Sequence, residues 1–147
     1  PTEAEWELAA RGGDRNVMYP WGDETLSCEH AHYDQCPTPV GNSEAGTRPV
    51  CDLPMGDSAD GLCNMAGNVW EWVQDEWHPS YSGAPIDGSG WCSTPGCPPE
   101  DQSENGHRVI RGGLWNGPED RLRVTYRTSN LPGAILGNLG GRLVMPR

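Results

Sequence analysis

The chain has no phenylalanine, no lysine and no long apolar run. Because no stretch approaches eighteen consecutive apolar residues, we expect no membrane-spanning helix. Residues 1–13 carry three glutamates and no apolar core, so they lack the pattern of a secretory signal. The 20 glycines and 14 prolines among 147 residues exclude a helical bundle or a coiled coil. Seven tryptophans argue against a disordered chain, so an ordered, loop-rich domain remains.

Acidic residues dominate the first part of the chain. Residues 1–107 contain nineteen acids and three arginines, whereas residues 108–147 contain seven arginines and two acids. The net charge of −11 disfavours nucleic acid as a general partner, because phosphates need a cationic surface. Two interpretations of the C-terminal arginines stay open. They pair with the N-terminal acids across the fold, or they hold an anion.

The chain has six cysteines, an even number that favours three disulfides in an oxidising compartment. We therefore expect a secreted, periplasmic or cell-surface protein. Cys92–Cys97 is the first expected pair, because it closes a Pro-Gly turn. Cys28–Cys36 and Cys51–Cys63 would complete a sequential pattern, although six cysteines allow fifteen pairings and a crossed one stays open.

Zinc is the competing interpretation of the first cysteine pair. The segment CEHAHYDQC places His30 and His32 between Cys28 and Cys36, and both cysteine and histidine bind zinc. However, the sequence contains no C-x-x-C pair, with which zinc sites usually begin.

Local patterns predict few regular elements. Thr2 and Glu5 form a capping box, and Gly12 ends a helix of about ten residues. Residues 66–77 alternate as a strand, with Val69, Glu71 and Val73 on one face and Trp70 and Trp72 on the other. Three further strand-like runs are 108–115, which ends at its glycine pair, 122–129 and 140–147, and residues 78–105 read as a long loop. The sequence thus predicts an irregular, loop-rich α+β domain with short strands and few helices.

Two pairs of adjacent acids could suggest a hydrolytic site. The two acids of each pair are adjacent in the sequence, so the side chains of Asp75–Glu76 and of Glu119–Asp120 point apart and do not flank one substrate. We expect both pairs to lie on solvated surfaces.

Five sequence blocks occur in an order that resembles the formylglycine-generating enzyme family, also called the sulfatase-modifying-factor domain. The blocks are PTEAEWELAARGG, YPWGD, GLCNMAGNVWEW, RVIRGG and NLGGR. The resemblance implies a variant of the C-type-lectin-like fold. Because the family's domain usually begins upstream of the first block, we expect residues 1–147 to be a single domain that lacks its N-terminal part.

Calcium is the cofactor that this resemblance implies. Residues 64–71, NMAGNVWE, offer an amide, backbone carbonyls and a carboxylate in one tight segment, an oxygen set that suits a hard cation. In the family this segment binds Ca²⁺, which implies Asn64 and Glu71 as side-chain ligands and Gly67 and Val69 as carbonyl ligands. The alternative is a core strand in which an arginine holds Glu71.

The catalytic residues of the family are absent. Its oxidase chemistry depends on two cysteines that follow the RVxRGG block and bind Cu(I) as thiolates. Here no cysteine follows Cys97, and Leu114 stands where the family commonly has serine after the glycine pair. We therefore expect no catalytic residues, and we interpret Cys92 and Cys97 as a structural disulfide.

A family member without these cysteines is expected to be a binding module for a protein or a small-molecule ligand. Tryptophan and arginine are favoured where a few side chains carry binding, and the segment that lines the family's substrate cleft is rich in both. Two alternatives stay open: an oxidoreductase with an altered active site, and a structural subunit of an extracellular assembly that buries these loops in a partner. The expected ligand-binding residues are Trp115, Asn116, Arg121, Arg123, Tyr126 and Arg127.

Overall fold

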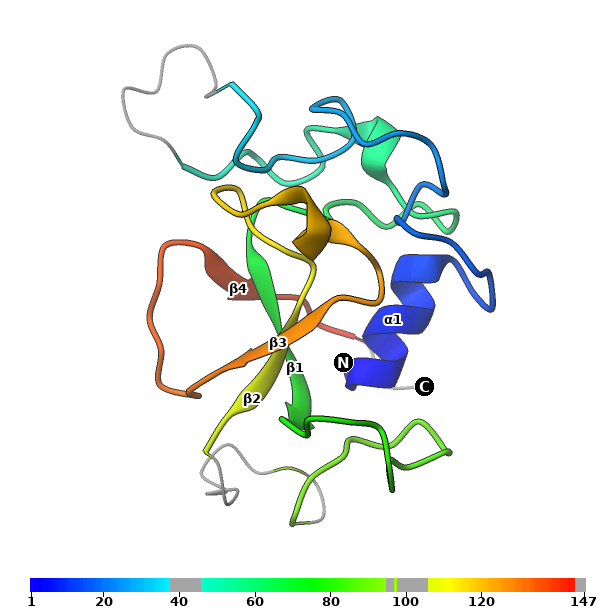
Figure 1. Ribbon diagram of the computed structural model, residues 1–147, viewed down its shortest axis with the longest axis vertical. Helices are drawn as coiled ribbons and strands as arrows, with labels where there is room; N and C mark the ends of the chain where they lie inside the picture. Colours follow the sequence, from blue (N-terminus) through cyan, green and yellow to red (C-terminus); the bar gives the residue numbers. More distant parts are fainter. Residues whose placement is uncertain (38–45, 95–96, 98–105, 145–147) are drawn as a thin grey trace.

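The computed structural model describes residues 1–37, 46–94, 97 and 106–144 (Figure 1). Its one α-helix stands beside a four-stranded sheet, and irregular segments gather beyond both ends of the strands. This arrangement confirms the predicted loop-rich α+β class. In chain order the elements are α1 (Glu3–Arg11), η1 (Pro54–Gly56), β1 (Trp70–Glu76), β2 (Arg108–Arg111), η2 (Glu119–Leu122), β3 (Arg127–Asn130) and β4 (Leu139–Gly141).

Helix α1 begins and ends as the sequence predicts. The Thr2 hydroxyl accepts the Glu5 N–H at 3.2 Å, and the Glu5 carboxylate accepts the Thr2 N–H at 2.9 Å. This capping box satisfies two N–H groups that the first turn leaves without helical partners. Gly12 ends the helix in the left-handed conformation at φ +65°. None of the described helices is long and apolar enough to span a membrane.

The sheet has the strand order β3-β2-β1-β4. Strands β3 and β4 are consecutive in sequence but lie at opposite edges of the sheet. Strands β1, β2 and β3 pair antiparallel, whereas β4 pairs parallel to β1. Trp72 lies opposite Ile110 on β2, and Trp70 lies opposite Leu139 on β4. Strand β1 is therefore the central strand that links the C-terminal segment to the rest of the sheet.

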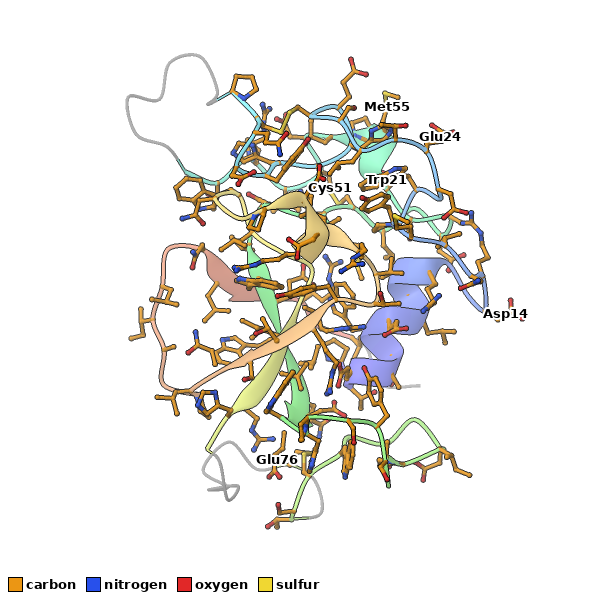
Figure 2. The ribbon with its side chains drawn as sticks, viewed as in Figure 1. Asp14, Trp21, Glu24, Cys51, Met55 and Glu76 are labelled. Carbon is orange, nitrogen blue, oxygen red and sulfur yellow. A yellow bond between two sulfur atoms is a disulfide. The ribbon has the colours of Figure 1, made fainter. Side chains whose placement is uncertain are left out.

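Both faces of β1 are covered by side chains, as the predicted alternation requires. Val73 packs with Trp6 of α1 in one cluster, whereas Trp70 packs with Ile110 on the opposite face. A third cluster around Tyr33 lies under the irregular segments, near the labelled Trp21 in Figure 2. Burial of these aromatic and aliphatic side chains supplies the main stabilisation of a fold with so little regular structure.

Two strand predictions place the boundaries wrongly. Strand β3 begins only at Arg127, because the preceding residues form η2 and then pack inward, with Leu122 and Val124 about 1% exposed. The Val124 N–H bonds to the Met18 carbonyl instead of to a strand. The terminal strand is β4, at 139–141, and the backbone then leaves the sheet; the predicted residues 145–147 lie outside the described part.

The expectation of a solvated surface is wrong for Asp75 and Glu76 and right for Glu119 and Asp120. Asp75 is 5% exposed and Glu76 1% exposed. Asp75 accepts the N–H groups of Glu3 and Trp91 at 2.6 and 2.9 Å, and burial raises the pKa of its carboxyl. The two acids do point apart, as predicted, because they lie on opposite faces of β1.

Candidate functional site

The Glu71 carboxylate is held by an arginine from the end of the chain. Its two oxygens bind Arg142, Oε1 to Nη2 at 2.5 Å and Oε2 to Nε at 2.6 Å. The Trp6 indole N–H also donates to Oε2 at 2.7 Å. Glu71 is 5% exposed, so this fork-shaped pair neutralises a charge that burial would otherwise disfavour.

The expected carbonyl ligands lie in a tight turn just before β1. Asn64 and Asn68 have positive φ values, and Gly67 has a φ of +75° with the His32 carbonyl where a Cβ would stand. The Asn64 amide oxygen accepts the Cys51 N–H at 2.6 Å. With Asn64 and Glu71 both engaged, the residues as arranged do not fit a bound Ca²⁺ unless Arg142 moves away. Among the described residues, no three His, Cys, Asp or Glu side chains gather as a metal cluster.

All six cysteines form disulfides, which confirms the sequence prediction. The pairs follow the sequential pattern: Cys28–Cys36, Cys51–Cys63 and Cys92–Cys97. The first disulfide removes the thiolates that the zinc alternative requires. Three disulfides suit an oxidising compartment.

Arginines of the C-terminal part pair with acids of α1, which confirms the first interpretation of the charge pattern. Arg111 is fully buried, binds Glu7 and lies 3.7 Å from Glu3. Arg127 binds both Glu3 oxygens at 2.8 and 2.7 Å. The chain thus distributes its charges so that opposite signs meet across the helix and the sheet.

Three of the six expected ligand-binding residues lie at the β4 side of the sheet or stack near it. The Asn116 amide oxygen accepts the amide N–H of Asn138, which immediately precedes β4. Trp115 is half-buried, and its indole N–H is buried without a hydrogen-bond partner among the described residues. The Tyr126 ring stacks on Trp70 with 5.9 Å between ring centroids. We call Trp115, Asn116, Tyr126 and Asn138 the loop surface.

The three expected arginines diverge from one another. Arg121 is half-buried on η2, and Arg123 is exposed just after η2, with its Nε donating to the Asp120 carbonyl at 3.0 Å. Arg127 faces α1, where its guanidinium lies 4.6 Å from the Trp77 ring and 4.4 Å from the Tyr81 ring. Arg127 is therefore part of the ion-pair network beneath α1 and does not point into the loop surface.

A cavity that the sequence analysis missed lies between α1 and the 81–91 segment. Its volume is about 510 Å³, within the range of small-molecule sites. Leu8, Pro85 and Trp91 supply apolar walls, while Asp75 and Tyr81 supply polar ones. Partial burial raises the pKa of Tyr81 to about 12, so its hydroxyl stays protonated and donates to Glu3 at 3.1 Å. The sequence signal that could have indicated this cavity is Leu8, an apolar residue on the side of α1 opposite Trp6.

Known proteins resemble the whole chain. The formylglycine-generating enzyme of Streptomyces coelicolor is 39% identical over 97% of this chain and 45% of its own length. The inactive C-alpha-formylglycine-generating enzyme 2 of Bos taurus is 33% identical over 97% of this chain and 42% of its own length. The structure of PvdO from Pseudomonas aeruginosa superposes with a TM-score of 0.73 and 31% identity, over 95% of this chain and 49% of that one.

The chain spans less than half the length of these curated relatives. The family model described as the sulfatase-modifying factor enzyme 1-like domain matches residues 1–147, all of the chain. With the predicted sequence blocks, the loop-rich fold and these relatives in agreement, the chain belongs to the formylglycine-generating enzyme family, as a sulfatase-modifying factor enzyme 1-like domain.

Proposed function

We propose that this domain is a non-catalytic, disulfide-bonded module that binds a protein or small-molecule ligand at the loop surface. The observation that carries the proposal is the half-buried Trp115 beside the Asn116–Asn138 amide pair. An indole supplies a large rigid contact area, and amides supply adaptable hydrogen bonds, a combination that is common at recognition surfaces.

The state of the cysteines supports a non-catalytic role. The oxidase chemistry of the family needs a pair of thiolates after the RVxRGG block, and this chain has no cysteine there. Its six cysteines are all engaged in disulfides elsewhere. The Bos taurus relative named as inactive indicates that this family also contains members without the activity.

Calcium stabilisation is a second, separate part of the proposal. The turn at 64–69 carries amide and carbonyl oxygens that a calcium ion could bind. The Glu71 carboxylate could bind the same ion only if Arg142 moved away from it. A calcium-bound form would therefore differ from the arrangement described here in the position of Arg142. Its test is a melting curve with Ca²⁺ and with chelator. A shift on chelation that Glu71→Ala abolishes supports calcium, and an identical curve in both solutions contradicts it.

An oxidoreductase with an altered active site is the alternative that the 39% identity to a formylglycine-generating enzyme favours. A turnover assay separates the two. The protein is given Cu(I), oxygen and a peptide with the sulfatase motif Cys-x-Pro-x-Arg, and mass spectrometry detects the aldehyde. Conversion overturns the non-catalytic proposal, whereas a folded protein that leaves the peptide unchanged supports it.

The position of the ligand is tested with a displayed library of random peptides. Peptides enriched on the wild-type domain are measured against Trp115→Ala and against Leu8→Arg, which fills the cavity beside α1 instead. We expect Trp115→Ala to weaken binding about tenfold or more and Leu8→Arg to leave it unchanged. The reverse pattern would move the binding site to the cavity.

We further propose that the protein acts in a secreted, periplasmic or cell-surface setting, where its disulfides persist.

A further inference from the structure

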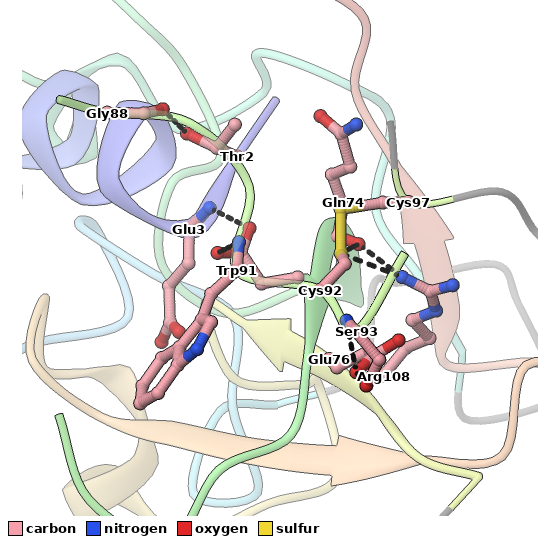
Figure 3. The surroundings of a disulfide bond; sticks show 11 residues. Thr2, Glu3, Gln74, Glu76, Gly88, Trp91, Cys92, Ser93, Cys97 and Arg108 are labelled. Atoms are coloured by element: carbon pink, nitrogen blue, oxygen red, sulfur yellow. Dashed lines mark hydrogen bonds between the residues drawn. A yellow bond between two sulfur atoms is a disulfide. The ribbon is translucent and has the colours of Figure 1, made fainter. Parts of the chain in front are cut away.

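The Cys92–Cys97 disulfide lies at the far end of β1 from the loop surface, next to a buried arginine. Figure 3 shows the Arg108 side chain pointing at the Cys92 sulfur, with its Nη1 at 3.4 Å. The same Nη1 donates to the Gln74 carbonyl at 2.7 Å, which fixes the guanidinium in this position. Arg108 is 7% exposed, so little water screens its charge from the sulfur.

Hydrogen bonds on both sides hold Cys92 in place. The preceding Trp91 donates its N–H to Asp75 at 2.9 Å, and its carbonyl accepts the Glu76 N–H at 3.0 Å. The following Ser93 donates both its N–H and its hydroxyl to Glu76 Oε2, at 3.0 and 2.7 Å. Cys92 would therefore stay beside Arg108 even if its disulfide were opened.

Cys97, the other half of the disulfide, is 8% exposed and borders a cavity among the described residues. Cys97 lines a cavity of about 220 Å³ together with Trp72, Arg108 and Pro132. The volume is several times that of a water molecule and admits a thiol group. A reagent in this cavity reaches Cys97, while the charge of Arg108 acts on Cys92.

We propose that Cys92–Cys97 is an exchangeable disulfide, which a dithiol reductant opens by attack on Cys97 with Cys92 as the leaving group. One reductant thiolate attacks the Cys97 sulfur, a mixed disulfide forms, and the Cys92–Cys97 bond breaks. The electron pair goes to Cys92, whose thiolate the Arg108 guanidinium stabilises. The second reductant thiol then gives up its proton and attacks the reductant sulfur of the mixed disulfide, which releases Cys97 as a thiolate that is then protonated. The disulfide gains two electrons and the dithiol is oxidised to a disulfide.

The nearby Glu76 carboxylate opposes the effect of Arg108 on a Cys92 thiolate. It is buried, its Oε2 is bound by Ser93, and its Oε1 has no hydrogen-bond partner in the part of the chain that the structure describes. A negative charge disfavours a thiolate, so the proposal requires that Arg108, which contacts the sulfur directly, outweighs Glu76. The decisive observation is therefore whether an Arg108 substitution slows or speeds the opening of the Cys92–Cys97 disulfide.

The test follows each disulfide separately during reduction. The folded protein is treated with limiting dithiothreitol, free thiols are trapped by alkylation at set times, and mass spectrometry of the peptides reports each pair. We expect Cys92–Cys97 to open about tenfold faster than Cys28–Cys36, which has no arginine hydrogen-bonded to its sulfurs in the described structure. Equal rates, or a slower Cys92–Cys97, would overturn the proposal.

Substitution of Arg108 separates charge from folding. Arg108→Gln should slow the opening of Cys92–Cys97 several-fold and leave the other two pairs unchanged, whereas Arg108→Lys should keep most of the rate. The matched control Val109→Ala weakens the same strand without changing its charge. Loss of structure alone speeds reduction, so a faster or unchanged rate in Arg108→Gln refutes the role of the charge. If Arg108→Gln does not fold, the proposal is tested by whether Cys92–Cys97 opens before Cys28–Cys36 in the wild-type protein.

Discussion

Glu71 and Arg142 form a two-pronged ion pair that joins β1 to the segment immediately after β4. The residues lie 71 positions apart in the sequence, and the parallel pairing of β1 with β4 brings them together. The pair holds the chain just after β4 against the inner strand β1. The same Glu71 carboxylate is the side-chain ligand proposed for Ca²⁺. Calcium binding therefore requires that Arg142 release it.

Removal of the arginine from this pair should destabilise the domain strongly. Arg142→Gln leaves the buried Glu71 charge with the Trp6 indole N–H as its remaining hydrogen-bond donor among the described residues, and it should lower the free energy of unfolding by about 3–5 kcal/mol. Urea unfolding followed by tryptophan fluorescence measures the change. The double variant Glu71→Gln with Arg142→Gln should recover part of the loss, because no buried charge then remains. A single variant within about 0.5 kcal/mol of wild type would show that the pair is not structural.

Arg127 should not tolerate lysine. Its guanidinium binds both Glu3 oxygens and lies between the Trp77 and Tyr81 rings, and an ammonium group cannot reproduce this planar geometry. We expect Arg127→Lys to lower the free energy of unfolding by about 1–3 kcal/mol. The exposed Arg123→Lys is the control and should change stability by less than about 0.5 kcal/mol. Equal effects of the two substitutions in chemical denaturation would contradict the network.

The capping box of α1 should be measurable on its own. Thr2→Ala removes the acceptor of the Glu5 N–H and the donor to the Gly88 carbonyl, so it should lower the free energy of unfolding by about 1 kcal/mol or somewhat more. Thr2→Ser keeps the hydroxyl and should stay near wild type. Thermal unfolding by circular dichroism compares the three proteins, and a Thr2→Ala melting temperature equal to that of wild type would refute the contribution.

His32 should make stability fall in mild acid. Burial lowers the pKa of His32, whose Nε2 bonds to the Gly46 carbonyl at 3.0 Å. The unfolded chain then binds a proton more readily than the folded one. The stabilisation is present above the ordinary histidine pKa of about 6.5 and is lost as the pH falls towards the lower folded value.

Denaturant unfolding at several pH values between about 7 and 5 measures this slope. His32→Gln has no titrating group and should flatten it. His30, which is half-buried and bonds to the Ser27 hydroxyl, supplies the control His30→Gln, for which the slope should remain. A slope that persists in His32→Gln would assign the acid sensitivity to another group.

Local patterns in the sequence were sufficient for the elements that depend on neighbours in the chain. The capping box, the glycine that ends α1 and the alternation along β1 involve residues within about a dozen positions, so their spacing in the sequence predicts them. The three short-range disulfides were favoured by the same closeness in sequence, but spacing did not exclude a crossed pairing. The sequence blocks also identified the family, which the comparisons then showed for the whole chain.

The candidate site depended on contacts that spacing does not reveal. Sequence reasoning could name an arginine as the alternative partner of Glu71, but only the sheet order identifies it as Arg142. Likewise, Arg127 was grouped with Trp115, yet the direction of its strand turns its guanidinium towards α1.

The sequence by itself therefore determined the family and most local elements, because each rests on residues close together or on a linear motif. It favoured the sequential cysteine pairs, and the structure decided between them and a crossed pairing. The tertiary structure alone decided which charges meet, where the strands end, and that Asp75 and Glu76 are buried. Those outcomes depend on long-range packing, in which the burial of one charge is favourable only when a distant segment supplies its partner.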